Sequence, residues 1–557
     1  MWVLSFYVSR EKPYYVGFKL ILVTGGVISG LGKGVIAASI GKLMQSRGFS
    51  VSMIKIDPYL NPDPGTLNPV EHGEVFVTEE VWHFHPGKGV EFKIAEIDED
   101  FGHYERFLDV NMHPSSNITS GQIMLSVILG ERKGVYLGQT IRLIPHVTEE
   151  IKKRVYEVAR REEPDILIVE LGGTVGDYEA MAFVEALRQL RLEVGTQNSV
   201  HIHVTYVPFV EILGEFKTKP AQLFFREVLA AGLPPDFVVA RTSSPLPENV
   251  RKKLALYASV PYDAVFEDPD LDIVYELPIY FERKGLGKKL EEKLGLRGKP
   301  DMGEWEEIVA KFREGEPRKI AMVGKYWRMS DVYISIVEAI RHAGAEAGVK
   351  PEIIPVDSEQ LEKGKEWDKL READGVLSTP GFGSRGTEGM ISAAAWALKE
   401  GKPFLGICFG AQLATVAFAR EVMGWEGANS TEIDPGTPWP VIDLLPEQKQ
   451  IEEVGGTMRL GGHEVVLLGG ILRRAYGKER VIERFRHRYH IIREYAEKMA
   501  ERGYKITAVD PSGRIINAFE VEDHPYFVGV QFHPEFKSRP GKPSPTYSSF
   551  IEAIKGT

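Results

Sequence analysis

The chain has 557 residues, a length that predicts two or three domains, each able to bury its own core. A formal net charge of −11 argues against general nucleic-acid binding, although local basic pockets remain compatible with it. A single cysteine excludes an internal disulfide, and no uninterrupted apolar stretch is long enough to span a bilayer. These features predict a cytoplasmic protein without a membrane segment.

The first half of the chain alternates predicted strands with predicted helices. Residues 19–26 form an apolar, β-rich run that ends in glycines, and residues 32–48 have apolar positions at helical spacing. Residues 50–57 are another buried-strand candidate, so this stretch has the order strand, glycine-rich turn, helix, strand. The pattern continues with two strands and a helix at residues 164–173, 201–208 and 180–195. This alternation is typical of a parallel α/β sheet.

A charged stretch punctuated by Gly and Pro separates the two halves, and we expect it to be a connector that carries a helix. The strand–helix alternation restarts at residue 320. Further strands are predicted at residues 351–357, 374–381, 402–408 and 526–532. The predicted fold is two doubly wound α/β domains. The predicted boundaries are an extension at 1–18, a first domain at 19–295, a connector at 296–318 and a second domain at 319–557.

The stretch TGGVISGLGKGV lies at the first strand-to-helix turn, where backbone N–H groups and the helix dipole favour anions. It departs from the Walker A loop, because Gly26 is one residue too far from Gly32 and Lys33. Gly34 also replaces the hydroxyl residue that would hold magnesium. A glycine-rich turn without a ligand is the alternative. The preceding strand, the following helix and the lysine favour a phosphate-binding loop.

Two acidic residues follow predicted strands of the first half. Asp57 ends one strand and Glu170 ends another, so in a doubly wound sheet both lie at the carboxyl edge, near the glycine-rich turn. Carboxylate oxygens are the ligands that magnesium requires. A solvated loop acid is an equally good interpretation of either residue taken alone. If the turn binds a nucleotide, these carboxylates are candidates for its magnesium.

The only cysteine, Cys408, lies in the sequence GICFG between a predicted strand and a predicted helix. This arrangement predicts a nucleophile elbow, in which the helix N-terminus favours a thiolate and the N–H of Phe409 faces a developing oxyanion. The stretch VGVQFHPEF supplies His533 as a base and Glu535 to orient it. The alternative is a structural cysteine near an unrelated histidine. The elbow and the His-x-Glu pair together favour the catalytic interpretation.

The second half resembles the class I glutamine amidotransferases in GICFG and FHPE, and the chain as a whole resembles the CTP synthase family. The stretches that carry this resemblance run in order from about Leu20 to the C-terminus. They are TGGVISGLGKG, KIDPYLNPDPGTLNPVEHGEVFVT, FGHYERF, LIPHVT, VELGGTVGDYEA, GEFKTKPAQ, VGKY, GFGSRGTEGM, NSTEI, GGTMRLG and RHRY.

The resemblance implies a role for each matching residue. Cys408 attacks the glutamine amide, His533 is the general acid and base, and Glu535 orients His533. Glutamine is implied to contact Gly381, Phe382, Phe409, Gln412, Glu432 and Arg488. ATP is implied to contact Ser29, Gly30, Leu31, Gly32, Lys33, Gly34, Lys55 and Asp57. UTP or CTP is implied to contact Ser29, Lys217, Thr218, Lys219 and Gln222, and magnesium Asp100 and Glu170.

The resemblance also implies an activity, the final step of de novo CTP synthesis. In the synthetase domain, 19–295, ATP phosphorylates the 4-oxygen of UTP. Ammonia released from glutamine in the glutaminase domain, 319–557, passes through an internal channel and displaces that phosphate. Positioned lysines and magnesium suit such a phosphoryl transfer. A homotetramer with nucleotide sites between subunits, activation by GTP and feedback inhibition by CTP are implied as well.

Residues 81–94 are an insertion relative to the family pattern, and they alternate like a hairpin around Pro-Gly-Lys-Gly. The acidic stretch after the insertion aligns so that Asp98 and Asp100 stay in place, while Ile97 and Glu99 replace Thr and Leu. Two further histidines, His83 and His85, share one strand face, where exposed hairpin histidines are favoured over metal ligands.

A second departure is Pro380, which has no N–H to donate to an oxyanion. Activity survives this replacement if Gly381 and Phe409 are the donors, and hydrolysis weakens by orders of magnitude if the N–H of the preceding position is needed. A third departure is His490, where glutamate is common.

Two other interpretations of the function stay open. One is a cobyrinate-type amide synthase, but the motifs KTKPAQ and HGEVFVT argue against it. The other is a non-catalytic, filament-forming homologue, and only Pro380 and the insertion support it.

Overall fold

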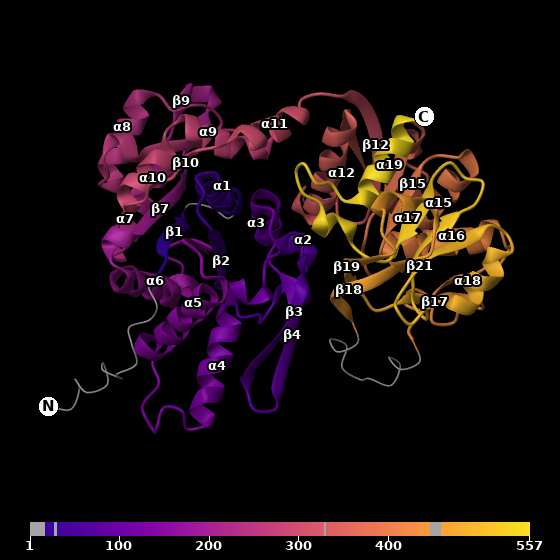
Figure 1. The fold of residues 1–557 in the computed structure, drawn as a ribbon, viewed down its shortest axis with the longest axis horizontal. Coiled ribbons are helices and arrows are strands. Elements are labelled where there is room, and N and C mark those ends of the chain that lie inside the picture. Colours follow the sequence, from indigo (N-terminus) through magenta and orange to yellow (C-terminus); the bar gives the residue numbers. More distant parts are fainter. Residues whose placement is uncertain (1–16, 27–29, 328–329, 446–457, 557) are drawn as a thin grey trace. The chain divides into compact units, whose positions relative to one another are not determined.

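The computed structural model describes residues 17–26, 30–327, 330–445 and 458–556 (Figure 1). The chain divides into two units. Unit 1 comprises Met1–Asp63, Trp82–Lys93 and His103–Glu306, and unit 2 comprises Pro64–Val81, Ile94–Gly102 and Glu307–Thr557. Two short segments from the first half of the sequence therefore belong to unit 2. Among the described residues, no helix combines the length and the apolar character needed to cross a membrane.

Unit 1 is built on a seven-stranded sheet in which every recorded neighbouring pair is parallel. In spatial order its strands are β11 (Val265–Asp268), β10 (Phe237–Arg241), β7 (Ser199–Tyr206), β1 (Lys19–Gly25), β6 (Ile166–Leu171), β2 (Val51–Asp57) and β5 (Asn117–Thr119). The central strands are buried along almost their whole length, which explains their continuous apolar runs.

Helices cover both faces of this sheet. On one face, α5 (Thr148–Glu162) and α6 (Met181–Val194) share a hydrophobic cluster with Leu167 and Val169 of β6. On the other face lies α1 (Lys33–Gln45), where a Cβ on Gly41 would be 3.6 Å from Ile168. The remaining longer helices of the unit are α4 (Ser120–Arg132), α7 (Lys219–Ala230), α8 (Glu248–Ala258), α9 (Leu277–Arg283) and α10 (Leu286–Leu294).

Unit 2 contains a nine-stranded sheet. Five strands pair in parallel, in the order β13 (Val349–Asp357), β12 (Glu316–Gly324), β14 (Gly375–Ser378), β15 (Phe404–Ile407) and β23 (Phe527–Val530). The sheet continues with four antiparallel strands, β22 (Ile516–Val521), β21 (Tyr504–Val509), β18 (Arg459–Leu467) and β19 (Arg480–His487). The parallel part was predicted, and the antiparallel part was not.

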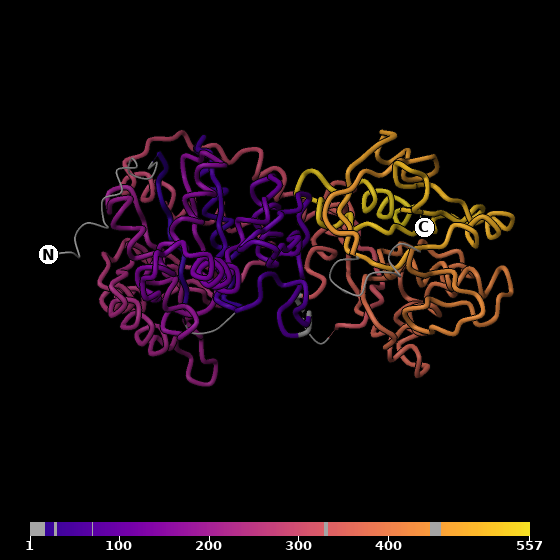
Figure 2. The backbone as a smooth tube through the Cα atoms, turned by 90° about the horizontal axis from the view of Figure 1, so that it is seen from below, coloured from indigo at the N-terminus to yellow at the C-terminus, as the bar shows by residue number. Residues whose placement is uncertain are grey.

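Helices again cover both faces. The cluster on one face includes residues of α15 (Thr387–Glu400) and α16 (Phe409–Glu421). The cluster on the other face includes residues of α12 (Ile334–Ala347), α17 (Gly470–Tyr476) and α19 (Pro545–Lys555). Figure 2 shows the yellow C-terminal segment folding back among the orange segments of this unit. The predicted fold, two doubly wound α/β domains, is confirmed.

The connector contains the predicted helix, α11 (Gly303–Lys311), and strand β12 begins at Glu316 rather than at residue 320. The insertion forms the predicted hairpin of β3 (Phe76–Gly87) and β4 (Val90–Ile97). Residues Trp82–Lys93 of this hairpin belong to unit 1, where the Arg154 guanidinium of α5 lies 5.5 Å and 4.9 Å from the ring centroids of Trp82 and Phe84. The insertion is thus an ordered part of the fold.

Candidate active sites

The lone thiol lies at a sharp turn between β15 and α16. Cys408 has φ +52° and ψ −106°, a strained conformation for a residue with a side chain. A Cβ on Gly406 would lie 2.9 Å from the Ala411 nitrogen, and one on Gly410 would lie 2.2 Å from the Ser378 oxygen. Only glycine fits at these two positions, so the predicted elbow is present.

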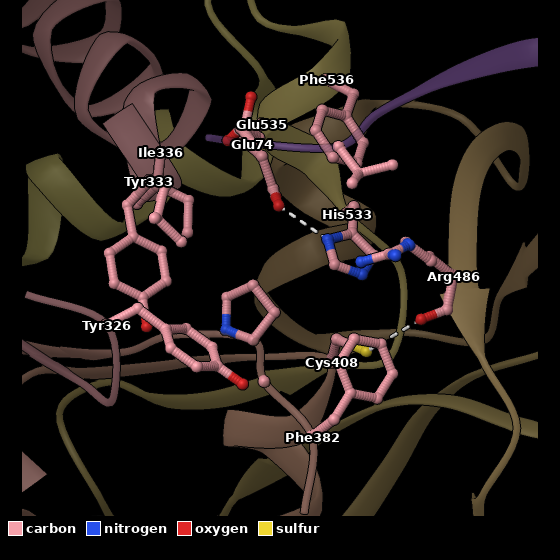
Figure 3. A pocket seen from close by; sticks show the side chains of 14 residues that line it. Glu74, Tyr326, Tyr333, Ile336, Phe382, Cys408, Arg486, His533, Glu535 and Phe536 are labelled. Atoms are coloured by element: carbon pink, nitrogen blue, oxygen red, sulfur yellow. Dashed lines mark hydrogen bonds and ion pairs between the residues drawn. The ribbon is translucent and has the colours of Figure 1, made fainter. Parts of the chain in front are cut away.

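The thiol contacts a backbone carbonyl oxygen of one strand and a side-chain amide that follows another. Cys408 Sγ contacts the Arg486 carbonyl oxygen of β19 at 3.6 Å, and Gln531 Nε2, just after β23, donates to Sγ at 3.6 Å. His533 Nδ1 and Glu535 Oε1 form a hydrogen bond of 2.7 Å, and both residues are buried. Figure 3 shows the His533 ring between Glu535 and Cys408. The structure therefore brings the three predicted catalytic residues together.

The charges of this group favour an imidazolium. Burial by itself lowers the pKa of His533, but the carboxylate of Glu535 and the interaction with Cys408 outweigh burial and raise the pKa to about 10. A protonated His533 stabilises a thiolate beside it. The arrangement can thus supply a nucleophilic sulfur and, from the same ring, a proton for a leaving amine.

We expect Glu535→Gln to slow alkylation of Cys408 by iodoacetamide at pH 7 by about tenfold. This factor corresponds to burial, no longer opposed by the carboxylate, bringing the pKa of His533 from about 10 to about one unit below the assay pH. The folded-state pKa of His533 is raised, so its charge is present below about pH 10 and falls when the carboxylate is removed. Less imidazolium means less thiolate at neutral pH, and the alkylation rate should recover as the pH rises. Because the chain has one cysteine, total thiol loss measures this site alone. An unchanged pH profile would contradict the role of Glu535.

All six residues predicted to hold glutamine line one cavity together with Cys408. Gln412 of α16 is fixed in it, since its Nε2 donates to the Tyr489 oxygen at 2.9 Å and to Gln531 Oε1 at 3.1 Å. Glu432 Oε1 accepts a hydrogen bond of 2.9 Å from the Gly383 N–H. The other cavity residues are Gly381, Phe382, Phe409, Met458, His487, Arg488 and Tyr489. A carboxylate, an arginine and amide groups beside a thiol suit an amino acid substrate.

A second cavity opens from the same thiol. Cys408, His533 and Glu535 line it, and so do Pro380, Gly381 and Phe382 (Figure 3). The remaining lining residues are Glu74, Val75, Tyr326, Val332, Tyr333, Ile336, Arg486 and Phe536. Arg486 Nε donates to Glu96 Oε1 at 2.5 Å, and the guanidinium carbon lies 5.2 Å from the Phe382 ring centroid. Both cavities belong wholly to unit 2.

In unit 1 the predicted phosphate loop joins β1 to α1. Gly32 precedes α1 with φ +78°, which explains a glycine there. Gly30, Leu31 and Gly32 form the turn, while Lys33 and Gly34 begin the helix, and Lys33 Nζ donates to the Gly173 oxygen at 3.1 Å. Ser29 lies outside the described residues. The N-terminus of α1 is thus placed to bind an anion.

The acidic residues of unit 1 gather around a buried lysine. Lys55 of β2 pairs with Glu170 of β6 in the sheet register, and its Nζ lies 3.5 Å from Glu170 Oε1 and 3.7 Å from Asp57 Oδ1. Tyr104 donates to Glu170 Oε2, and Asn117 Nδ2 donates to Asp57 Oδ2 at 2.7 Å. The predicted ATP residues Lys55 and Asp57 therefore lie together with the predicted magnesium ligand Glu170.

The donor set of this group fits magnesium, which is typically held by one or two carboxylates together with substrate phosphates and water. No cluster of three or more ligating side chains occurs in the part of the chain that the structure describes. The other predicted ligand, Asp100, is the first residue of α3 (Asp100–Leu108) and belongs to unit 2, where its N–H donates to Asp98 Oδ1 at 3.0 Å. The Nδ1 of exposed His83 lies 2.5 Å from Glu91 Oε1, and the Nε2 of exposed His85 lies 3.9 Å from the same oxygen, so both hairpin histidines face this carboxylate.

The predicted uridine nucleotide residues surround the start of α7. Gln222 Nε2 donates to Thr218 Oγ1 at 2.9 Å, Lys217 pairs with Glu215, and Lys219 is the first helical residue. This helix packs on the phosphate turn, because a Cβ on Gly26 would lie 2.7 Å from the Phe224 ring. The structure therefore places these residues and the turn in one region of unit 1.

Sequence reasoning missed several residues around the thiol. Gln531, Arg486 and Glu74 line or contact the site, and the motifs VGVQFHPEF, RHRY and HGEVFVT contain them without indicating which side chains turn inward. Lys325 of VGKY was also assigned no role. His490 is buried with its ring centroid 4.7 Å from that of His487, and nothing in the structure explains its replacement of glutamate.

Known proteins resemble this chain over both units. Residues 19–296 match the family described as CTP synthase N-terminus, and residues 328–553 match glutamine amidotransferase class-I. The chain is 48% identical to CTP synthase of Methanopyrus kandleri over 97% of its own length and 99% of that protein. It is 49% identical to CTP synthase of Pyrobaculum calidifontis, with 96% and 98% covered.

A solved glutaminase domain of Trypanosoma brucei CTPS with bound acivicin is 33% identical, with a TM-score of 0.41, and covers 43% of this chain and 94% of that structure. The elbow thiol, the His-x-Glu pair and the glycine-rich turn described above lie within the two matched regions. Because the likeness to curated relatives extends over nearly the full length of both, the chain belongs to the CTP synthase family.

Proposed function

We propose that this protein aminates UTP to CTP, using ATP and the ammonia that it releases from glutamine. One observation carries the proposal: a chain similar to CTP synthases over 97% of its length brings a thiol, an imidazole and a carboxylate together at an elbow. Each turnover would consume UTP, ATP, glutamine and water, and would yield CTP, ADP, phosphate and glutamate.

In unit 2, Cys408 would attack the side-chain amide carbon of glutamine. The sulfur–carbon bond forms, the amide oxygen gains negative charge, and the N–H groups of Gly381 and Phe409 would stabilise it. His533 then protonates the amine as the carbon–nitrogen bond breaks, which leaves a thioester and free ammonia. Water hydrolyses the thioester to glutamate with His533 as the base. Phe382, Gln412, Glu432 and Arg488 would hold the substrate.

Ammonia needs a route that keeps it from being protonated in bulk water. The cavity that opens from Cys408 toward Val75, Tyr333 and Ile336 supports an internal channel, because its lining is largely apolar and aromatic. Neutral ammonia crosses such a lining more readily than ammonium does. We therefore propose that ammonia leaves the thiol through this channel.

In unit 1, the turn at Gly30–Gly32 and the N-terminus of α1 would hold ATP phosphates with Lys33 and Lys55. Lys217, Thr218, Lys219 and Gln222 would hold UTP. Glu170 would hold Mg²⁺, which would supply positive charge to the phosphates when bound. The assignment of Asp100 as a second ligand rests on family membership alone. Asp57 and Tyr104 orient the lysine and the carboxylate of this group.

The assembly and its regulation belong to the same proposal. Large apolar side chains of unit 1 that are more than four-fifths exposed, Leu137, Tyr178 and Ile212, support a homotetramer. Activation by GTP and inhibition by CTP rest on family membership alone, and a cytoplasmic location rests on the single cysteine. The division into residues 19–295, 296–318 and 319–557 is also proposed.

The test is an assay of the purified protein with UTP, ATP and Mg²⁺, with CTP measured directly. We expect CTP with either ammonium chloride or glutamine as the nitrogen source. Activity with ammonium alone would mean an inactive glutaminase, and UTP left unaminated with both sources would refute the proposal. A cobyrinate-type substrate in place of UTP tests the amide synthase alternative.

A further inference from the structure

Lys325 contacts two segments that line the cavity of the thiol, although the sequence shows no link between this lysine and those segments. It follows β12 and is only 3% exposed. Its stem packs against the loop after β14, since a Cβ on Gly381 would lie 3.5 Å from Lys325 Cδ. A lysine is rarely buried to this extent unless its ammonium group has partners.

The ammonium group has partners on two separate segments. Lys325 Nζ donates to the Phe382 oxygen at 3.1 Å and to the Gly383 oxygen at 2.5 Å, both in the loop after β14. It also lies 4.2 Å from the ring centroid of Phe409, the first residue of α16. A cation over an aromatic face at this distance is attractive, and more so away from water. One side chain therefore contacts the loop of Gly381 and the side chain of Phe409.

These are the segments that carry the two N–H groups proposed to stabilise the oxyanion. The loop is held from a second direction, because Glu432 Oε1 accepts the Gly383 N–H at 2.9 Å. Pro380 contributes no donor, so stabilisation depends on the placement of the Gly381 and Phe409 amides relative to each other. A shift of either segment would separate the two donors.

We propose that Lys325 is a positioning residue that locks the Gly381 loop against Phe409, so that both N–H groups face the oxyanion during glutamine hydrolysis. This inference rests on the proposed function.

The electrostatics support a charged lysine in this role. Burial lowers the pKa of Lys325 to about 8, while Glu432 and Glu362 raise it and Arg385 lowers it. Since this pKa lies above 7, the ammonium form predominates at neutral pH. Charge-assisted hydrogen bonds to two carbonyl oxygens are stronger than those of a neutral amine.

The test compares Lys325→Met with the native protein in glutamine hydrolysis. We expect kcat/KM to fall about 10- to 100-fold, mostly in kcat, because the oxyanion exists only along the reaction path. Inhibition by the γ-semialdehyde of glutamate should weaken by the same factor, since its thiol adduct carries an oxygen where the oxyanion forms. Alkylation of Cys408 by iodoacetamide forms no oxyanion and should change less than about twofold.

Two variants serve as controls. Lys319→Met, in the strand that Lys325 follows and paired with Glu372 at 3.3 Å, should keep native hydrolysis. Lys325→Arg retains a cation and should lose less than Lys325→Met. Unchanged semialdehyde inhibition, alkylation slowed as much as hydrolysis, or equal losses in the two Lys325 variants would overturn the inference. Absence of glutamine hydrolysis in the native protein would instead refute the proposed function.

Discussion

Replacement of Cys408 by alanine is expected to reduce glutamine-driven CTP synthesis by roughly 1000-fold or more and to leave ammonium-driven synthesis within about twofold of native. The sulfur is the only nucleophile in the arrangement, and neither His533 nor Glu535 can form the thioester. Ammonia supplied from outside needs no thiol. The measurement is initial CTP formation with saturating UTP and ATP, once with glutamine and once with ammonium chloride.

Ammonium-driven synthesis by the Cys408→Ala variant serves as the control for correct folding. The thiol is buried, and its removal deletes one atom from a turn whose backbone is fixed by Gly406 and Gly410. Ammonium-driven activity reports on unit 1 of the same preparation. Persistent glutamine-driven synthesis would contradict the assignment of the nucleophile. Loss of synthesis with both nitrogen sources would contradict the proposed division of labour between the units.

The sequence predicts best those parts of the fold whose burial is uniform. Strands β1, β2 and β6 are covered on both faces, so their residues are apolar almost without interruption. Strands β18 and β19 are only partly buried and carry charged residues, among them Arg484 and Arg486, so no apolar run marks them. Strands β18 and β19 were missed for this reason, whereas β22 is buried almost throughout and was missed as well.

The residues of the candidate site also fall into two groups, those that local sequence indicates and those that only the folded chain brings together. His533 and Glu535 are two residues apart on a segment that follows a buried strand, so local sequence indicates that they act together. Lys325 meets the Gly383 oxygen only because β12 and β14 are neighbours in the sheet. That neighbourhood is a property of the whole topology, and no local pattern of residues encodes it. Residues that act through another segment are therefore visible only once the chain is folded.

Glu170→Gln is expected to lower CTP synthesis by about 100-fold with glutamine and with ammonium alike. Glu170 is fully buried, and its Oε1 lies 3.5 Å from Lys55 Nζ. Glutamine keeps the volume and an oxygen that can accept the Tyr104 hydroxyl, but it removes the charge that would bind Mg²⁺ and balance Lys55. A defect in unit 1 cannot be bypassed by supplying ammonia, which distinguishes this variant from Cys408→Ala.

The dependence on metal concentration separates the two possible reasons for this loss. If Glu170 holds Mg²⁺, the variant should need more Mg²⁺ for half-maximal CTP formation, and high Mg²⁺ should restore part of the rate. A loss that no Mg²⁺ concentration relieves would show that the carboxylate serves only to orient Lys55. Glu193→Gln, which removes an ion pair of 2.5 Å between α6 and Lys152 of α5 in the same unit, is the matched control and should stay within about twofold of native. Glutamate release from glutamine should persist in both variants, because Cys408, His533 and Glu535 lie in unit 2.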